Sequence, residues 1–233
     1  MEVYSINQIA PVLKLDTRQL QRMAERGDIP ARKVGGEWRF THSEILEWLE
    51  GRVGGGNAQE LMELEKMMER LGAETALENR PISELLLLDG MKVPLRGRTG
   101  KSIVREMVET AMQTNLLWDP DAMETAIFER EAMCPTALEN GAALLHPRHP
   151  MTDILGDPFI AFGRTPAGVP FASNGVLTDV FFLICSVNDT QHLRTLARLG
   201  RILTVPDFLP QLRELEDSSE ILRLFRETEA ELK

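Results

Sequence analysis

A run of three consecutive glycines, Gly54-Gly55-Gly56, interrupts this chain of 233 residues near its N-terminal end. Glycine loses more backbone freedom on folding than any other residue, so such a run is not expected inside a helix or a strand. The composition, 43% hydrophobic and 27% charged, is typical of a globular protein, and the length fits one or two domains. We therefore predict three parts: residues 1–52, a linker with a connector helix over 53–79, and residues 80–233.

The longest apolar runs, Leu85–Leu88 and Val180–Cys185, are far shorter than the roughly 18 residues of a membrane-spanning helix. No membrane segment is predicted, and no basic and apolar secretory leader is visible. The two cysteines, Cys134 and Cys185, stand far apart without a pairing pattern, which indicates reduced thiols. We expect a cytoplasmic protein.

The net charge of −10 argues at first against nucleic acid, but it is unevenly distributed. Residues 1–52 hold 8 basic and 8 acidic side chains, whereas residues 53–233 hold 18 and 28. Within the short part, residues 14–42 carry seven basic against four acidic side chains. A locally basic surface on an acidic protein is a better indication of nucleic-acid binding than the charge of the whole chain.

Capping patterns divide residues 1–52 into helices. Ser5 with Gln8, and Asp16 with Gln19, each predict the start of a helix, and Thr41 with Glu44 predicts a third. Between the second and third helices, Gly35-Gly36 predicts the turn of a small hairpin over residues 32–40. Helix, helix, hairpin and helix in this order form the layout of a small winged helix-turn-helix domain.

The helix over residues 17–26 is the candidate for insertion into the major groove of double-stranded DNA. Its outward side chains have suitable types, since arginine reads guanine and glutamine reads adenine, while basic side chains on the hairpin suit phosphates. The alternative from the residues alone is a solvated, charged helix in a structural module. The candidate DNA-binding residues are Thr17, Arg18, Gln21, Arg22, Arg32, Lys33 and Arg39.

The segment Gly27-Asp28-Ile29-Pro30-Ala31-Arg32-Lys33-Val34-Gly35-Gly36-Glu37-Trp38-Arg39-Phe40, with the two helices before it, resembles the excisionase-type, MerR-like DNA-binding domain. The resemblance covers residues 3–50. It implies binding of duplex DNA through the second helix and the hairpin wing. Pro11, inside the first helix, departs from the pattern because it removes a backbone hydrogen bond.

Residues 58–72 follow the glycines as a predicted helix. Four apolar side chains on it are spaced by three, four and three residues, which is an a/d seam of about two heptads. Such a short seam fits equally well a helix packed on the next domain and the contact of a homodimer. The seam residues are Leu61, Leu64, Met68 and Leu71.

From residue 82 onward, strand and helix patterns alternate, which favours a layered α/β domain. We predict a short helix over 83–88 and further helices over 101–113, 120–133, 191–202, 206–212 and 219–232. Strands are predicted over 91–95, 142–145, 158–163 and 178–186. Gly100-Lys101-Ser102 is not predicted to bind nucleotide, because a P-loop needs glycine where Leu95 stands.

Three of the four histidines, His146, His149 and His192, fall in this acidic part. His146 and His149 with Cys134 make only a weak metal pattern, and no metal or other cofactor is expected. A neutral imidazole is nucleophilic near pH 7 and suits phosphoryl transfer, with an arginine to hold the phosphoryl oxygens.

The stretch from Arg130 through Asn140-Gly141 to His146, and the later stretch Leu177–Ser186 with Gln191-His192-Leu193, resemble the enzyme IIA domain of the fructose/mannitol and nitrogen branches of the phosphotransferase system. The resemblance spans residues 80–233 and implies a three-layer α/β/α fold with a mixed five-stranded sheet. It makes His146 the phosphoryl acceptor, His192 its neighbour and Arg130 the cation that holds phosphate. Leu144-Leu145 before His146 and Pro147 after it depart from the family pattern.

These resemblances predict a DNA-binding transcriptional regulator whose IIA-like domain senses the phosphotransferase system through phosphorylation of His146. The implied partners are double-stranded DNA and the histidine phosphocarrier protein. One alternative is a phosphocarrier that relays the phosphoryl group through His146, and would then be a catalytic component. Another is a degenerate IIA domain that binds a partner.

Overall fold

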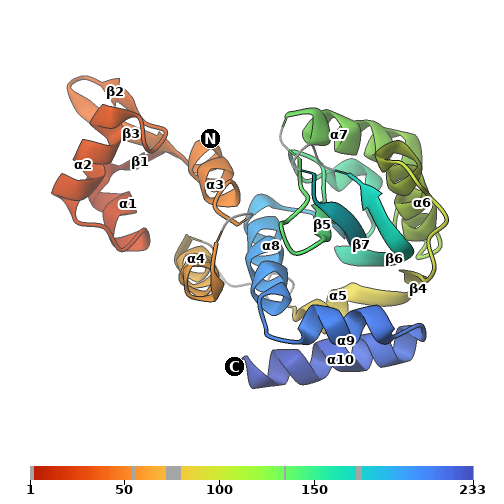
Figure 1. Ribbon diagram of the computed structural model, residues 1–233. Coiled ribbons are helices and arrows are strands. Elements are labelled where there is room, and N and C mark those ends of the chain that lie inside the picture. The colour runs from red at the N-terminus through yellow and green to blue at the C-terminus, as the bar shows by residue number, and fades with distance from the viewer. Residues whose placement is uncertain (1–2, 54–55, 72–79, 134, 172–174, 233) are drawn as a thin grey trace.

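The N-terminal unit consists of three helices and a three-stranded sheet of order β1-β3-β2 (Figure 1). In this computed structural model, residues 3–53, 56–71, 80–133, 135–171 and 175–232 are described, with backbone only at 68–71. Gly54, Gly55 and Cys134 therefore lie outside the described residues, as does 72–79 of the predicted connector. The elements are β1 (Val3–Ser5), α1 (Ile6–Val12), α2 (Thr17–Arg26), β2 (Arg32–Val34), β3 (Glu37–Thr41) and α3 (His42–Glu50).

The helix starts lie where the caps predict them. Ser5 and Gln8 form a capping box at α1, and the Asp16 carboxylate accepts a hydrogen bond of 2.8 Å from the Gln19 amide at α2. Gly27 ends α2 in the left-handed conformation, with a φ of 77°. Pro11 lies inside α1. Strand β1 was not predicted and pairs with β3 from Val3 opposite Thr41.

The wing is the predicted hairpin. Gly35 and Gly36 both have positive φ, 60° and 85°, which a two-residue turn of the primed kind requires. The turn sets Val34 opposite Glu37, so that β2 and β3 pair antiparallel. The wing therefore projects from the same unit as α2.

Helix α4 (Ala58–Leu71) packs along α8 (Asp189–Leu203) of the same chain (Figure 1). Leu61 and Leu64 are buried, and Leu61 lies against Gly200 of α8. Buried Glu65 accepts a hydrogen bond of 2.8 Å from Arg198. The first half of the predicted seam is thus an intramolecular contact, whereas the side chains of Met68 and Leu71 lie outside the described residues.

The C-terminal unit contains a four-stranded mixed sheet of order β4-β6-β7-β5. The prediction of five strands is wrong for the described residues. After a register shift between Arg164 and Val169, β6 pairs with β7 again, so this stretch lengthens a strand and does not add one. The strands are β4 (Leu86–Lys92), β5 (Ala142–Leu145), β6 (Phe159–Pro170) and β7 (Leu177–Cys185).

Successive side chains of a strand point to opposite faces, and here both faces are apolar. Phe162 and Phe182 pack on the face covered by α8, α9 (Phe208–Glu214) and α10 (Ser218–Glu231). Phe181 and Leu183 pack on the face covered by α6 (Gly100–Met112) and α7 (Pro120–Met133). The predicted three-layer α/β/α architecture is confirmed (Figure 1).

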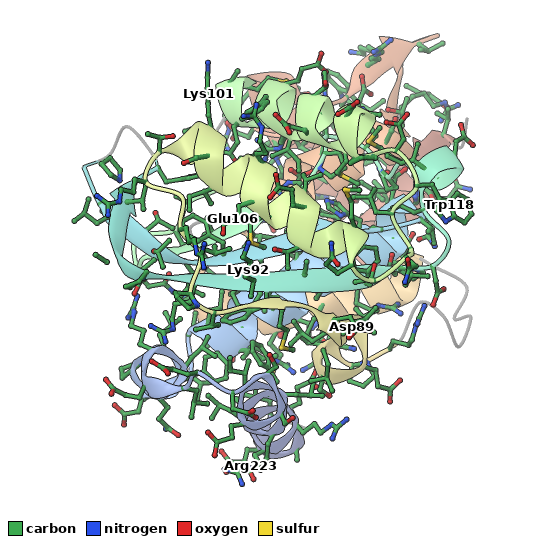
Figure 2. The ribbon with its side chains drawn as sticks, turned by 90° about the vertical axis from the view of Figure 1, so that its right-hand side faces the viewer. Asp89, Lys92, Lys101, Glu106, Trp118 and Arg223 are labelled. Carbon is green, nitrogen blue, oxygen red and sulfur yellow. The ribbon has the colours of Figure 1, made fainter. Side chains whose placement is uncertain are left out.

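The helix predicted over 83–88 is only partly correct, since α5 (Ile82–Leu85) is one turn long and β4 begins at Leu86. A short apolar run does not distinguish a helix from a buried strand. The loop before α6 is held by Glu106, which accepts hydrogen bonds from the amides of Arg96 and Gly97 and pairs with Lys92 at 2.8 Å. Figure 2 shows Lys92 and Glu106 close together and Lys101 projecting outward. The amides of this loop therefore bind a carboxylate of the protein, whereas the loop amides of a P-loop bind phosphate.

Among the described residues, no helix is both long and apolar enough to cross a membrane.

Candidate functional site

Two of the predicted site residues follow neighbouring parallel strands. His146 comes directly after β5, and His192 lies in the first turn of α8, shortly after β7. Strands β5 and β7 pair in parallel, with Ala142 opposite Val180, so their carboxyl ends share one edge of the sheet. In α/β sheets this edge is the usual place for a ligand. Both histidines are almost fully buried, because each residue is only 3% exposed, so the pair lies at the base of the site.

The two imidazoles are held by different partners. Their ring centroids are 5.0 Å apart. His146 Nδ1 lies 2.6 Å from the carbonyl oxygen of Leu144, which can only accept, so Nδ1 carries a proton. His192 Nδ1 lies 3.2 Å from the hydroxyl of Ser186, while its Nε2 is buried without a hydrogen-bond partner in the described structure. Because these contacts engage only the Nδ1 atoms, the Nε2 atom of each imidazole is left to interact with other groups in the site.

Arg130, the third predicted residue, reaches the site from α7. Its guanidinium does not face an empty pocket, because it binds the carboxylate of Glu50 through Nη2 at 2.8 Å and Nε at 3.2 Å. The same oxygen of Glu50 lies 3.0 Å from His146 Nε2. The structure therefore brings His146, His192 and Arg130 together and adds Glu50 from α3.

Glu50 was missed by the sequence reasoning. It is the last residue of α3, and 96 positions separate it from His146. Glu47, one turn earlier, makes a second contact of the same kind, with Arg148 at 2.9 Å. The spacing of the two glutamates on one helix face was the available signal, but charged faces of helices are common and usually solvated.

The charges of the site shift two pKa values. Burial would raise the pKa of the Glu50 carboxyl, but the hydrogen bond and charge of His146, together with Arg130, outweigh it and lower that pKa to about 2. Burial, aided by the charges of His146 and Arg130, lowers the pKa of His192 to about 3. At neutral pH Glu50 is thus a carboxylate and His192 a neutral imidazole.

These assignments fix the form of His146 in this arrangement. A carboxylate can only accept a hydrogen bond, so His146 Nε2 donates to Glu50 while Nδ1 donates to Leu144. His146 thus bridges the Leu144 carbonyl and the Glu50 carboxylate, and it completes a hydrogen-bonded network with Glu50 and Arg130. The Nε2 lone pair is not available while this contact holds.

The ligand atoms of Glu50, His146 and His192 lie within 4.8 Å of one another, a spacing that a metal ion could bridge. The Arg130 guanidinium on the same carboxylate oxygen opposes a further cation there. His149 is exposed and lines only the edge of a small cavity beside Glu50, and Cys134 lies outside the described residues. The arrangement therefore favours an anion over a metal.

The predicted DNA-binding residues lie together on the other unit. Gln21 of α2 and Lys33 and Arg39 of the wing line one groove of about 250 Å³. Two wing arginines pair with acids of their own unit, Arg32 with Glu44 at 2.6 Å and Arg39 with Glu37 at 2.7 Å. In Figure 1, α2 and the wing lie on the side of this unit away from the α/β unit, whereas α3 lies toward it. The exposed residues of the set are Thr17, Arg18, Gln21, Arg22, Arg32 and Lys33.

Comparison with known families agrees with both units. Residues 86–228 match the family described as "Phosphoenolpyruvate-dependent sugar phosphotransferase system, EIIA 2". Residues 3–53 match a model described as "Helix-turn-helix domain". The chain belongs to the EIIA 2 family of the phosphotransferase system, and it carries a helix-turn-helix domain at its N-terminal end.

Two curated relatives show the range of this family. The chain is 29% identical over 149 residues to a "PTS system fructose-specific EIIABC component" of Bacillus subtilis (strain 168), covering 63% of this chain but only 23% of that protein. It is 27% identical over 148 residues to a "Nitrogen regulatory protein" of Bradyrhizobium diazoefficiens, covering 60% of this chain and 92% of that one.

Solved structures share the fold of the C-terminal unit. IIA mannitol from Escherichia coli has a TM-score of 0.53 at 20% identity and covers 59% of this chain and 96% of that one. The nitrogen regulatory protein IIA-Ntr from Neisseria meningitidis has a TM-score of 0.55 at 20% identity and covers 62% and 98%.

Proposed function

We propose that this protein is a DNA-binding transcriptional regulator whose EIIA unit senses the phosphotransferase system through phosphorylation of His146. The main observation in support is that His146, His192 and Arg130 converge on one site in a chain that also has a helix-turn-helix domain. In this division of labour, residues 1–52 bind DNA, residues 53–79 connect, and residues 80–233 receive the signal. A cytoplasmic location, where DNA and phosphocarrier proteins meet, follows from the proposal.

The geometry supports His146 as a nucleophile once Glu50 withdraws. With Nδ1–H held by the Leu144 carbonyl, the neutral ring presents its lone pair at Nε2. Nε2 bonds to phosphorus as the nitrogen–phosphorus bond of the donor phosphohistidine breaks, and the donor imidazole leaves with that electron pair. The Arg130 guanidinium, and a proton on His192 Nε2, are placed to hold phosphoryl oxygens.

Phosphorylation is tested with phosphoenolpyruvate, enzyme I and the histidine phosphocarrier protein. We expect an acid-labile, alkali-stable label on the wild-type chain and none on H146A. The control is H149A, because His149 lies three residues away and its side chain is exposed. Equal labelling of H146A and wild type, or absence of label even from a chain in which Glu50 is replaced, would remove the proposed acceptor.

DNA binding is tested by footprinting on genomic fragments. We expect protection by the wild-type chain and its loss in the double variant R18A/R22A. The control is R223A, which removes an exposed cation on α10, far from the N-terminal unit. Binding that is absent in all three, or unchanged in the double variant, would contradict the role of α2.

Helix-turn-helix domains commonly bind paired half-sites as dimers. We therefore include a homodimer on DNA in the proposal, although Leu61 and Leu64 are both buried within their own chain, Leu61 against α8.

A relay role is the second candidate, favoured by one solved relative that is a complex of enzyme IIA mannitol with phosphorylated enzyme IIB mannitol from Escherichia coli. In that case the labelled chain passes its phosphoryl group to a separate acceptor, and the helix-turn-helix domain only docks. Transfer from the labelled chain without any protected DNA would favour this role.

A further inference from the structure

We propose that the Glu50 carboxylate occupies the place of the phosphoryl group, so that docking of the helix-turn-helix domain and phosphorylation of His146 exclude each other. This proposal rests on the proposed function, and it adds how the signal passes between the two units. In the docked state, a side chain of α3 of the DNA-binding domain occupies the phosphoryl site.

Glu50 makes the contacts that an incoming phosphoryl group requires. Its oxygen accepts from His146 Nε2 at 3.0 Å and from Arg130 at 2.8 Å. An anion thus already sits on the cation and on the acceptor atom. The carboxylate side chain is only 12% exposed, so it fills the site and does not merely lie over it.

Little space is left beside the carboxylate. The cavity next to Glu50 measures about 20 Å³, close to the volume of a single water molecule. It is lined by α3, by Arg148 and His149, and by the start of α8. A phosphoryl group with three oxygens does not fit while Glu50 is present. His192 Nε2, buried and unpartnered in the described structure, marks the direction in which such a group would find a donor.

The docked state also removes the nucleophile. His146 Nε2 donates a hydrogen bond to Glu50, so this nitrogen has no lone pair for attack on phosphorus while the contact holds. Glu50 must leave, and the proton of Nε2 must pass to solvent, before the nitrogen–phosphorus bond forms. Docking therefore opposes phosphorylation sterically, electrostatically and chemically.

Phosphorylation in turn opposes docking. A phosphoryl group adds about −1.5 to −2 charges at neutral pH. It would lie beside Glu50 and near Glu47, whose partner Arg148 is half-exposed. The negative charges of the phosphoryl group and of the two glutamates repel each other, so phosphorylation drives α3 away from the site.

The domain also contacts α8 through α3, and α4 through the region of α1, where Lys14 pairs with Glu63. Between the N-terminal unit and α4 lies a cavity of about 600 Å³, lined largely by apolar side chains including Met23, Trp48 and Leu64. Packing there is incomplete, whereas α4 itself is fixed to α8 through Glu65. The domain can thus change its orientation while the chain stays assembled.

The test measures the initial rate of His146 phosphorylation in the full chain, with potassium phosphoramidate as a small donor and with the histidine phosphocarrier protein. The variants are E50A and the milder E50Q, with circular dichroism to confirm folding. The matched control is E47A, which removes the exposed pair with Arg148 on the same helix face but does not touch His146. Exposed ion pairs contribute little to stability. This control therefore separates the effect of emptying the site from a general weakening of the interface.

We expect both Glu50 variants to be phosphorylated at least about tenfold faster than wild type by either donor, and E47A to differ less than about threefold. Equal rates in wild type, E50Q and E50A would overturn the exclusion while leaving His146 phosphorylation intact. Absence of label from every variant with both donors would instead overturn the proposed phosphorylation, and the exclusion with it.

Discussion

Glu50 and His146 belong to different units of the chain, 96 positions apart, yet the carboxylate oxygen of one lies 3.0 Å from Nε2 of the other. The pair joins the end of the last helix of the helix-turn-helix domain to the proposed acceptor atom of the EIIA site. A chemical change at a single nitrogen can therefore reach the other unit without any intermediate structural pathway.

His192 is expected to stabilise the phosphoryl group through Nε2. Replacing it in H192A removes a buried donor, and loss of one such donor commonly costs about a hundredfold in rate. We expect the rate of His146 phosphorylation to fall by about that factor in protein that circular dichroism shows to be folded. Quantifying labelled protein over time measures this, and a rate within twofold of wild type would show that His192 has no part in the transfer.

The stability of the EIIA unit should depend on pH through His192. Its pKa is lowered from 6.5 to about 3 in the folded protein, so the unfolded chain takes up the proton first. The stabilisation is complete above pH 6.5 and is lost as pH falls toward 3, by about 2 kcal/mol at pH 5.

Urea unfolding at pH 7.5 and pH 5 measures the effect, with H192N as the comparison that lacks the titrating group. Glu50 contributes only about 0.2 kcal/mol between these values, because its pKa of 4.5 in the unfolded chain and of about 2 in the folded protein both lie below pH 5. An equal pH dependence in H192N and wild type would refute the assignment.

Two kinds of DNA contact should respond differently to mutation. Lys33 lies on the wing and is expected to bind phosphate, so K33A should weaken binding to all sequences and reduce the slope of log affinity against log salt by about 1. Gln21 on α2 is expected to read a base, so Q21A should lose discrimination by about 1–3 kcal/mol at one base pair. Titrations at several salt concentrations on matched and altered sites separate the two. The same salt slope for K33A and wild type would place Lys33 outside the interface.

Gly141 positions the strand that carries His146. It has a φ of 88°, and an added Cβ would lie 2.8 Å from Arg213 Nη2 and 3.2 Å from an Asp179 oxygen. These two side chains form an ion pair of 2.7 Å, so they cannot yield freely. We expect G141A to lower the free energy of unfolding by about 2–4 kcal/mol.

Gly175 is the matched control for this change, because its φ of 78° is similar but no atom of the described residues lies within 4 Å of an added Cβ. G175A should therefore lose only the cost of backbone strain, about 1–2 kcal/mol. If thermal unfolding showed equal losses in both variants, the contact with Arg213 would have no energetic role.

Local signals in the sequence were sufficient for much of the fold. The cap at Asp16 and the turn at Gly35-Gly36 act over a few residues, so α2 and the wing could be predicted from them. Strand β1 has only three residues and shows no alternation, and the apolar run at Leu86 fits a helix or a strand equally well.

The histidines and Arg130 were identified because their sequence context resembles a family. The contact of Glu50 with His146 could not be predicted, since it depends on how two separately patterned units pack. No periodicity on α3 distinguishes a glutamate that enters a site from one that faces solvent.

The mutual exclusion of Glu50 and the phosphoryl group is tested most directly by the distance between the two units. This distance is measured in the same sample before and after phosphorylation. Spin labels at V34C on the wing and K101C on α6, in a chain with C134S, report it by pulsed dipolar electron resonance, since Val34 and Lys101 are exposed and Cys185 is buried. We predict one narrow distance distribution in the unmodified protein and a broader, shifted one once His146 is phosphorylated, with E50A resembling the phosphorylated form. An unchanged narrow distribution in fully phosphorylated protein would contradict the exclusion.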